Sequence, residues 1–96
     1  MYVLVRTDLP PPQRAVQACH AVLEARHFIS EDDDHPHLVL CGVADLLALQ
    51  EAVATIGQDH AVFIEADIGD EPTAAAFKPV RGPDRRPFRK LKLLEI

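Results

Sequence analysis

Polar side chains suited to general-base hydrolysis stand at or near the ends of predicted strands. Asp8 follows one apolar, strand-like run, and Asp67 follows another. Gln17 and His20 lie on the helix predicted after the first run. In open α/β sheets, sites gather beyond the carboxyl ends of the strands, and an aspartate beside a histidine can hold a water molecule and take its proton. Each residue also has a structural reading: Asp8 bracing a turn, Asp67 in an ordinary turn, and His20 packed or exposed without chemistry.

The sequence does not support other catalytic and metal chemistries. The four glycines are scattered singly, so there is no phosphate-binding loop, and Ser30, the only serine, lies outside any nucleophile-elbow motif. Cys19 and His20 are adjacent on a helix and point about 100° apart, which argues against a thiol–histidine pair. His35 and His37 are able to bind a transition metal, but nothing around them fixes a coordination geometry. We expect no metal or other cofactor.

The hydrophobic pattern predicts one small α/β domain. Apolar, β-branched runs alternate with helical periodicities in the order β-α-β-α-β-β, which implies right-handed crossovers and helices packed on the faces of a sheet. We expect a mixed, mostly parallel four-stranded sheet, with no second domain in these 96 residues. Segment 88–94 fits either an edge strand or a short helix. The predicted strands are 2–6, 37–42, 60–65 and 73–80, the helices are 13–28 and 44–56, and the loops are 30–37, 67–72 and 81–87.

The first predicted helix carries two stripes of side chains. Val16, Cys19 and Leu23 recur at helical spacing, so we expect them to form the apolar face. A polar stripe lies beside this face at the same spacing. It comprises Gln13, Gln17, His20 and Glu24.

The two cysteines and the hydropathy pattern bear on location. Cys19 and Cys41 are too few to staple a secreted mini-domain, and we expect them to be reduced and mostly buried in a cytoplasmic protein. No apolar run reaches the roughly 18 residues that a membrane span requires. We therefore expect no membrane partner.

The net charge of −5 conceals an asymmetry along the chain. Residues 1–77 carry three basic and thirteen acidic side chains, a sum of −10, whereas residues 78–96 carry seven basic and two acidic ones, a sum of +5. A polyanion responds to a local patch rather than to the total charge, so the basic segment is a candidate nucleic-acid surface. The alternative is a solvated basic loop that has no partner.

Four motifs, in one order along nearly the whole chain, resemble the type II peptidyl-tRNA hydrolase family. Members of that family open with a strand ending Arg-x-Asp-Leu, followed by a helix with Ala-Ala-Gln-x-x-His-Ala and later by a strand ending Asp-x-Gly. Val3–Leu9, Ala15–Ala21 and Ile64–Gly69 match these motifs, and the tail at Lys90–Leu94 is also similar.

This resemblance implies a compact α/β domain that hydrolyses the ester between a peptide and the 3′ end of tRNA without a metal. It implies catalytic roles for Gln17, His20 and Asp67, and tRNA binding through the basic segment 78–92. A homodimer is a further candidate assembly. The residues assigned to substrate binding are Arg6, Asp8, Arg14, Thr73, Lys78 and Arg81.

The sequence departs from the family pattern at two places. The family lysine before the Ala-Ala-Gln segment aligns with Gln13, next to Arg14, and the family threonine after Asp-x-Gly aligns with Glu71, with Thr73 two residues on. An arginine is a poor substitute for such a lysine because it stays charged. Two alternatives therefore stay open: a binding module on the same fold that no longer hydrolyses an ester, and an interaction domain whose basic tail pairs with another chain. A shared pocket requires the tip of strand 2–6 and the loop after 60–65 to meet over the amino half of helix 13–28.

Overall fold

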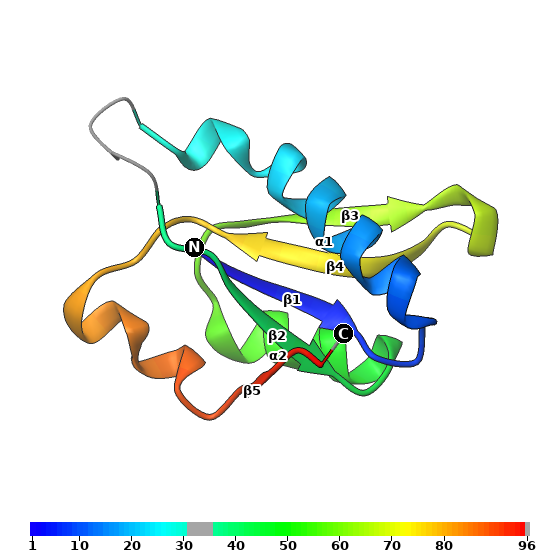
Figure 1. Ribbon diagram of the computed structural model, residues 1–96. Helices are drawn as coiled ribbons and strands as arrows, with labels where there is room; N and C mark the ends of the chain where they lie inside the picture. Colours follow the sequence, from blue (N-terminus) through cyan, green and yellow to red (C-terminus); the bar gives the residue numbers. More distant parts are fainter. Residues whose placement is uncertain (31–35, 96) are drawn as a thin grey trace.

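A five-stranded mixed sheet lies between two α-helices, as Figure 1 shows. The computed structural model describes residues 1–30 and 36–95. The strands are β1 (Tyr2–Arg6), β2 (Val39–Val43), β3 (His60–Glu65), β4 (Glu71–Phe77) and β5 (Lys92–Leu93). The helices are α1 (Pro11–Glu24) and α2 (Leu46–Ile56), with short 3₁₀ helices η1 (Arg26–Phe28), η2 (Ala66–Ile68) and η3 (Gly82–Phe88).

The strand order is β3-β4-β1-β2-β5, and one of the four strand pairs, β1–β2, is parallel. The expectation of a mostly parallel, four-stranded sheet is therefore wrong, although the predicted element order is confirmed as far as β4. The strand count differs because the tail adds the two-residue β5 beside β2. The orientation differs because β4 lies between β3 and β1, so β3 pairs antiparallel with β4 and touches no parallel neighbour.

This topology gathers the ends of several strands. β1, β2 and β3 finish, and β4 begins, at one end of the sheet, which we call the site end. The arrowheads of β1, β2 and β3 point to it in Figure 1. The opposite end, where β1 and β3 begin and β4 finishes, is the far end. Side chains separated by up to 65 positions in the sequence meet at the site end, as Arg6 and Glu71 do.

The core has two layers, one on each face of the sheet. α1 packs on the face formed by Val3, Val5, Ala74 and Ala76, whereas α2 and η3 cover the face formed by residues such as Leu4 and Phe77. Three consecutive alanines of β4, at 74–76, are fully buried in the middle of the sheet. The small side chains of Ala74 and Ala76 leave room for α1 to lie close to the sheet, and Ala75 faces α2.

The buried face of α1 is not the stripe that the sequence pattern favours. Val16 and Leu23 are 45% and 56% exposed, and Cys19 is exposed as well. The prediction that these residues face the core is wrong because α1 meets the sheet through smaller side chains. The buried residues of α1 are Gln17, Ala18 and Ala21, followed by Ala25 just beyond its end. Cys41, in contrast, is buried as expected.

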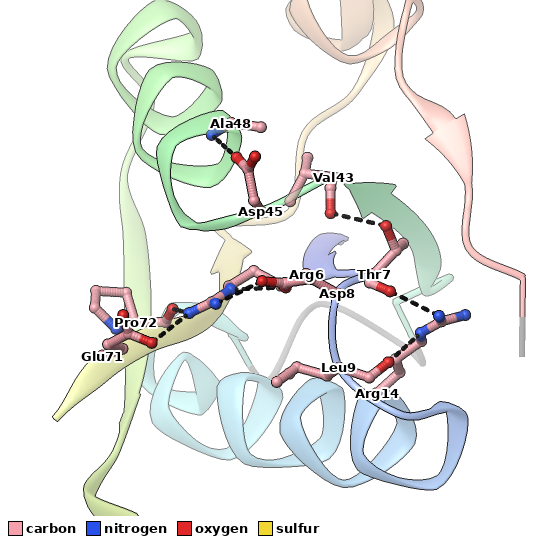
Figure 2. Close-up of polar contacts among 10 residues, drawn as sticks. All are labelled: Arg6, Thr7, Asp8, Leu9, Arg14, Val43, Asp45, Ala48, Glu71 and Pro72. Atoms are coloured by element: carbon pink, nitrogen blue, oxygen red, sulfur yellow. Dashed lines mark hydrogen bonds and ion pairs between the residues drawn. The ribbon is translucent and has the colours of Figure 1, made fainter. Parts of the chain in front are cut away.

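Local sequence signals define the helix ends. α1 begins at Pro11, two residues earlier than predicted, because proline at the first helical position has a suitable fixed φ and needs no hydrogen-bond acceptor. α2 begins after Asp45, whose carboxylate accepts a hydrogen bond of 2.9 Å from the Ala48 amide (Figure 2). It ends at Gly57, which adopts the left-handed conformation at φ 67°.

The basic segment after β4 is more ordered than a loop. Residues Gly82–Phe88 form η3, and Phe88 anchors it in the core by stacking on Tyr2 at 4.2 Å and meeting Phe77 edge-on at 5.0 Å, both measured between ring centroids. Most of the predicted acidic loop at 30–37 lies outside the described residues. No helix in the described ranges is long and apolar enough to cross a membrane.

Candidate active site

A chain of hydrogen bonds links α1, β4 and β3 at the site end. The Thr73 hydroxyl donates to Gln17 Oε1 at 2.8 Å, and Gln17 Nε2 donates to Glu65 Oε2 at 2.9 Å. Thr73 is fully buried and Gln17 is 2% exposed. Because both ends of the Gln17 amide are bonded inside the protein, the amide is held in one orientation and presents the Glu65 carboxylate toward the surface.

A β-bulge places Thr73 in this chain. Phe63 pairs with Ala74 and Ile64 pairs with Pro72, so Thr73 is the extra residue of β4. Strict alternation along β4 would turn Thr73 to the α2 face, whereas its hydroxyl bonds to Gln17 of α1. A bulge re-aims a side chain in this way, and such bulges are common beside active sites.

Glu65, the last residue of β3, is the carboxylate that the Thr73–Gln17–Glu65 chain positions. The hydrogen bond from Gln17 is the main reason that the pKa of Glu65 lies below its ordinary value, and the Asp67 backbone N–H and the nearby charge of His20 add to the effect. Asp67 is among the site residues that the sequence predicts, whereas Glu65 is not. The available signal was its place at the end of a predicted strand, where sites gather in α/β folds.

His20 lies over the edge strand β3. Its ring stacks on Phe63 with 4.5 Å between ring centroids and an interplanar angle of 11°. The side chain is exposed, and it stands three residues after Gln17, on the adjoining part of the same helix surface. The structure therefore brings His20, Gln17 and Glu65 to one place.

Asp67 lies at the rim of this group rather than within it. It belongs to η2 and is exposed, and its backbone N–H donates to Glu65 Oε1 at 3.3 Å. Its carboxylate makes no hydrogen bond or ion pair to the residues that the structure describes. Asp67 is thus an exposed carboxylate two residues beyond Glu65, the last member of the Thr73–Gln17–Glu65 chain.

Arg6 and Asp8 hold the tip of β1 against β4 (Figure 2). Arg6 is 6% exposed and binds Asp8 through two hydrogen bonds of 3.0 and 2.7 Å, Glu71 at 3.2 Å and the Pro72 carbonyl oxygen at 3.1 Å. Hydrogen bonding to Arg6 lowers the pKa of Asp8, and hydrogen bonding to Asp8 raises that of Arg6. The guanidinium is fully engaged inside the protein, so its evident role is to brace the site end.

Arg14 is also engaged internally. Its guanidinium donates to the carbonyl oxygens of Leu9 at 2.8 Å, Thr7 at 2.7 Å and Glu95 at 2.9 Å. Figure 2 shows the first two of these bonds closing the turn between β1 and α1. Arg14 therefore fastens this turn and the tail of the chain, and its donors do not point at a substrate.

Lys78 and Arg81 lie away from the other candidate residues. β4 carries the chain from Thr73 at the site end toward Lys78 at the far end, where the Lys78 amide donates to the Asp59 carbonyl oxygen at 2.9 Å. Arg81 immediately precedes η3. The basic segment thus begins at the far end and finishes at Lys92, which pairs with Gly42 near the end of β2, whereas His20 lies on the α1 face over β3.

The described residues contain no group of three or more histidine, cysteine, aspartate or glutamate side chains that could hold a metal ion. His35 lies outside the described residues, so the pairing of His35 with His37 is untested. An open hollow between Phe28, Val53 and His60 lies at the start of β3 and contains none of the candidate site residues.

Comparison with known proteins adds no family assignment. No protein-family model matches the chain, and no curated protein matches it at a significant level.

Proposed function

We propose that this chain hydrolyses the ester that joins a peptide to the 3′ end of tRNA, as its resemblance to the type II peptidyl-tRNA hydrolases implies. The observation that supports the proposal is the meeting of Gln17 and His20 with the end of β3 and the buried Thr73. Gln17 and His20 come from one motif, and the fold brings them within hydrogen-bonding or stacking range of β3 and β4 residues more than 40 positions later in the sequence.

His20 is the group best placed to act as a general base. It is exposed, its ring stacks on Phe63, and it is close enough to Glu65 to contribute to the lowered pKa of that carboxylate. In the reaction, His20 takes a proton from water, the water oxygen attacks the ester carbonyl carbon, and the ribose oxygen leaves with the proton. Glu65 stabilises the imidazolium that forms in between. Asp67, at the rim, has a free carboxylate that can hold the attacking water.

The basic segment 78–92 would supply the electrostatic attraction for RNA. Binding of this kind weakens steeply as salt rises, because phosphate contacts release counterions. β4 spans roughly 20 Å between the site end and the far end, from seven residues at about 3.3 Å each. RNA bound at Lys78 must therefore extend at least this far for its 3′ end to reach His20, whereas Lys92 pairs with Gly42 of β2, close to the site end.

The test is hydrolysis of an N-blocked aminoacyl-tRNA by the purified chain. His20→Ala should lower kcat at least about 100-fold, the usual contribution of a general base, and Asp67→Asn should lower it less. His27→Ala is the matched control, because His27 is an exposed histidine whose ring contacts Phe28 at a tilted angle outside the site. Turnover that is equal in the His20 and His27 variants would refute the assignment.

A binding module without hydrolysis is the second candidate function. Its support is that Arg6 and Arg14, the basic residues nearest the site, are engaged inside the protein, and that Gln13 stands where the family has a lysine. The same preparation distinguishes the two functions. Salt-sensitive RNA binding with no ester cleavage by the parent chain supports the binding module and rejects the hydrolase.

A further inference from the structure

The Glu65 carboxylate is held by hydrogen bonds from two different elements. Gln17 Nε2, on α1, donates to its Oε2 atom at 2.9 Å, and the Asp67 backbone N–H, in η2, donates to its Oε1 atom at 3.3 Å. The Gln17 amide is in turn fixed by the Thr73 hydroxyl, which donates to Gln17 Oε1 at 2.8 Å. The orientation of the carboxylate is therefore set by the fold before any ligand binds.

Part of the hydrogen-bonding capacity of Glu65 is unused. A carboxylate has about four lone-pair positions, and among the described residues Gln17 is the only one whose side chain donates to this carboxylate. The Glu65 side chain is half-buried, so a ligand can reach it from solvent. The hydrogen bond from Gln17 lowers the pKa of Glu65, which keeps the carboxylate ionised and able only to accept. A group that binds Glu65 must therefore bring a hydrogen-bond donor.

A phosphate group is a poor ligand for this position. Arg6 binds two carboxylates and a backbone carbonyl oxygen of the fold, and Arg14 binds three backbone carbonyl oxygens, so both guanidinium groups are engaged inside the protein. The ionised carboxylate of Glu65 repels a phosphate, because both are negatively charged. Recognition of an RNA end at Glu65 therefore falls to the neutral hydrogen-bond donors of that end.

The substrate of the proposed function carries two neutral donors beside the scissile ester. These are the 2′-hydroxyl of the terminal ribose and the first amide N–H of the peptide, whereas the ester oxygens only accept. A hydroxyl forms a shorter hydrogen bond to a carboxylate than an N–H does, and its hydrogen rotates toward the acceptor. The amide hydrogen is fixed in the peptide plane. The 2′-hydroxyl is therefore the better partner for a carboxylate whose own orientation is fixed.

We propose that Glu65 is a specificity-determining residue that accepts a hydrogen bond from the 2′-hydroxyl beside the scissile ester, and so selects RNA ends over ends that lack this hydroxyl. The 2′-hydroxyl is the group by which a protein distinguishes RNA from DNA at a given site. Thr73 is fully buried and Gln17 is 2% exposed, so they act as positioning residues that hold Glu65 without contacting the substrate. This inference rests on the proposed function, because it assigns a partner to one group of that substrate.

The first test compares two N-blocked aminoacyl-tRNAs that differ only in the terminal sugar, ribose or 2′-deoxyribose. After each kcat/KM is divided by the rate of uncatalysed hydrolysis, the wild-type chain should favour the ribose substrate by about 10- to 150-fold, the range for a hydrogen bond to a charged group. Glu65→Ala should bring this ratio close to one. Loss of imidazolium stabilisation in the same variant slows both substrates alike, so it does not change the ratio.

Asp67→Asn is the matched control for this ratio. It should lower the turnover of both substrates but keep the ratio, because the backbone N–H that bonds to Glu65 is retained. Thr73→Val should lower the ratio by about 2- to 12-fold, the range for loss of one neutral hydrogen bond, whereas Thr73→Ser keeps the hydroxyl and should keep the ratio. A wild-type ratio close to one, or an unchanged ratio in Glu65→Ala, would overturn the proposal, and equal ratios in the two Thr73 variants would refute the positioning role.

The second test measures binding of a non-cleavable substrate analogue, in which a 3′-amide replaces the ester. Its ribose and 2′-deoxyribose forms are compared by fluorescence anisotropy with the wild-type chain and Glu65→Ala. Tighter binding of the ribose form that is lost in Glu65→Ala supports recognition of the 2′-hydroxyl, and if the ester is not cleaved, the proposed hydrolysis alone is rejected. Ester cleavage without discrimination between the sugars rejects the role of Glu65 alone. Absence of both cleavage and binding overturns both proposals.

Discussion

Replacing Thr73 by valine should loosen α1 from the site end while keeping the shape of the side chain. Valine lacks the hydroxyl that donates to Gln17 Oε1 at 2.8 Å, and Gln17 is only 2% exposed, so water cannot easily replace the lost donor. An unpaired buried acceptor costs about 1–3 kcal/mol. For a domain of this size each kcal/mol lowers Tm by about 4–8 °C, so we expect a fall of roughly 5–20 °C.

Thermal and urea unfolding of four proteins measures this effect: wild type, Thr73→Val, Gln17→Leu and the double variant. The double variant should lose less stability than the sum of the single losses, because it removes both members of a bonded pair. Thr55→Val, on the exposed side of α2, is the control and should stay within about 0.5 kcal/mol of wild type. If Thr73→Val is as stable as the Thr55 variant, or if the two single losses simply add, Thr73 and Gln17 are not coupled as the structure indicates.

Three further predictions concern the turn, the ion pair and the cysteines. Arg14→Lys should lower the free energy of unfolding by about 1–2 kcal/mol, measured by urea unfolding, because an ammonium cannot reach three separate carbonyl oxygens. Hydrogen bonding to Arg6 lowers the pKa of Asp8. The ionised Asp8 carboxylate therefore stabilises the fold above the ordinary aspartate pKa, and this stabilisation is lost as the pH falls through the lowered value. Asp8→Asn should flatten the acid limb of a profile of unfolding free energy against pH. Cys19 should react with a thiol reagent in the native protein, whereas Cys41, 1% exposed and with its pKa raised by burial, should react only after unfolding.

The individual elements were largely predictable from local sequence. The β-branched runs gave the bounds of Tyr2–Arg6 and His60–Glu65 correctly, because both are short, apolar and followed by polar turn residues. The end of α2 was also marked in advance by Gly57. These signals act within a few residues, so they do not depend on how the elements are later arranged.

The arrangement was less predictable, because it depends on contacts between distant segments. Nothing local shows that β4 inserts between β3 and β1, and an alternating pattern of strands and helices favours parallel neighbours. The face of α1 was misassigned because the pattern weights the large residues Val16 and Leu23, whereas close packing against β4 favours alanine. The role of Thr73 depends on a bulge, and that of Glu65 on its bond to Gln17, neither of which has a local signature.

The run of alanines at 74–76 limits which substitutions the middle of the protein can tolerate. All three residues are fully buried, and they alternate between the α1 face and the α2 face, so added methyl groups have no free space on either side. Enlarging Ala74 or Ala76 would push α1 outward. This movement would draw Gln17 of α1 away from its hydrogen-bond partner Thr73, which directly precedes Ala74 in β4. The small volume of the three alanine side chains therefore sets the spacing of the polar groups at the site end. Substitution by larger residues at 74–76 would disrupt the hydrogen-bonded geometry before it unfolds the protein.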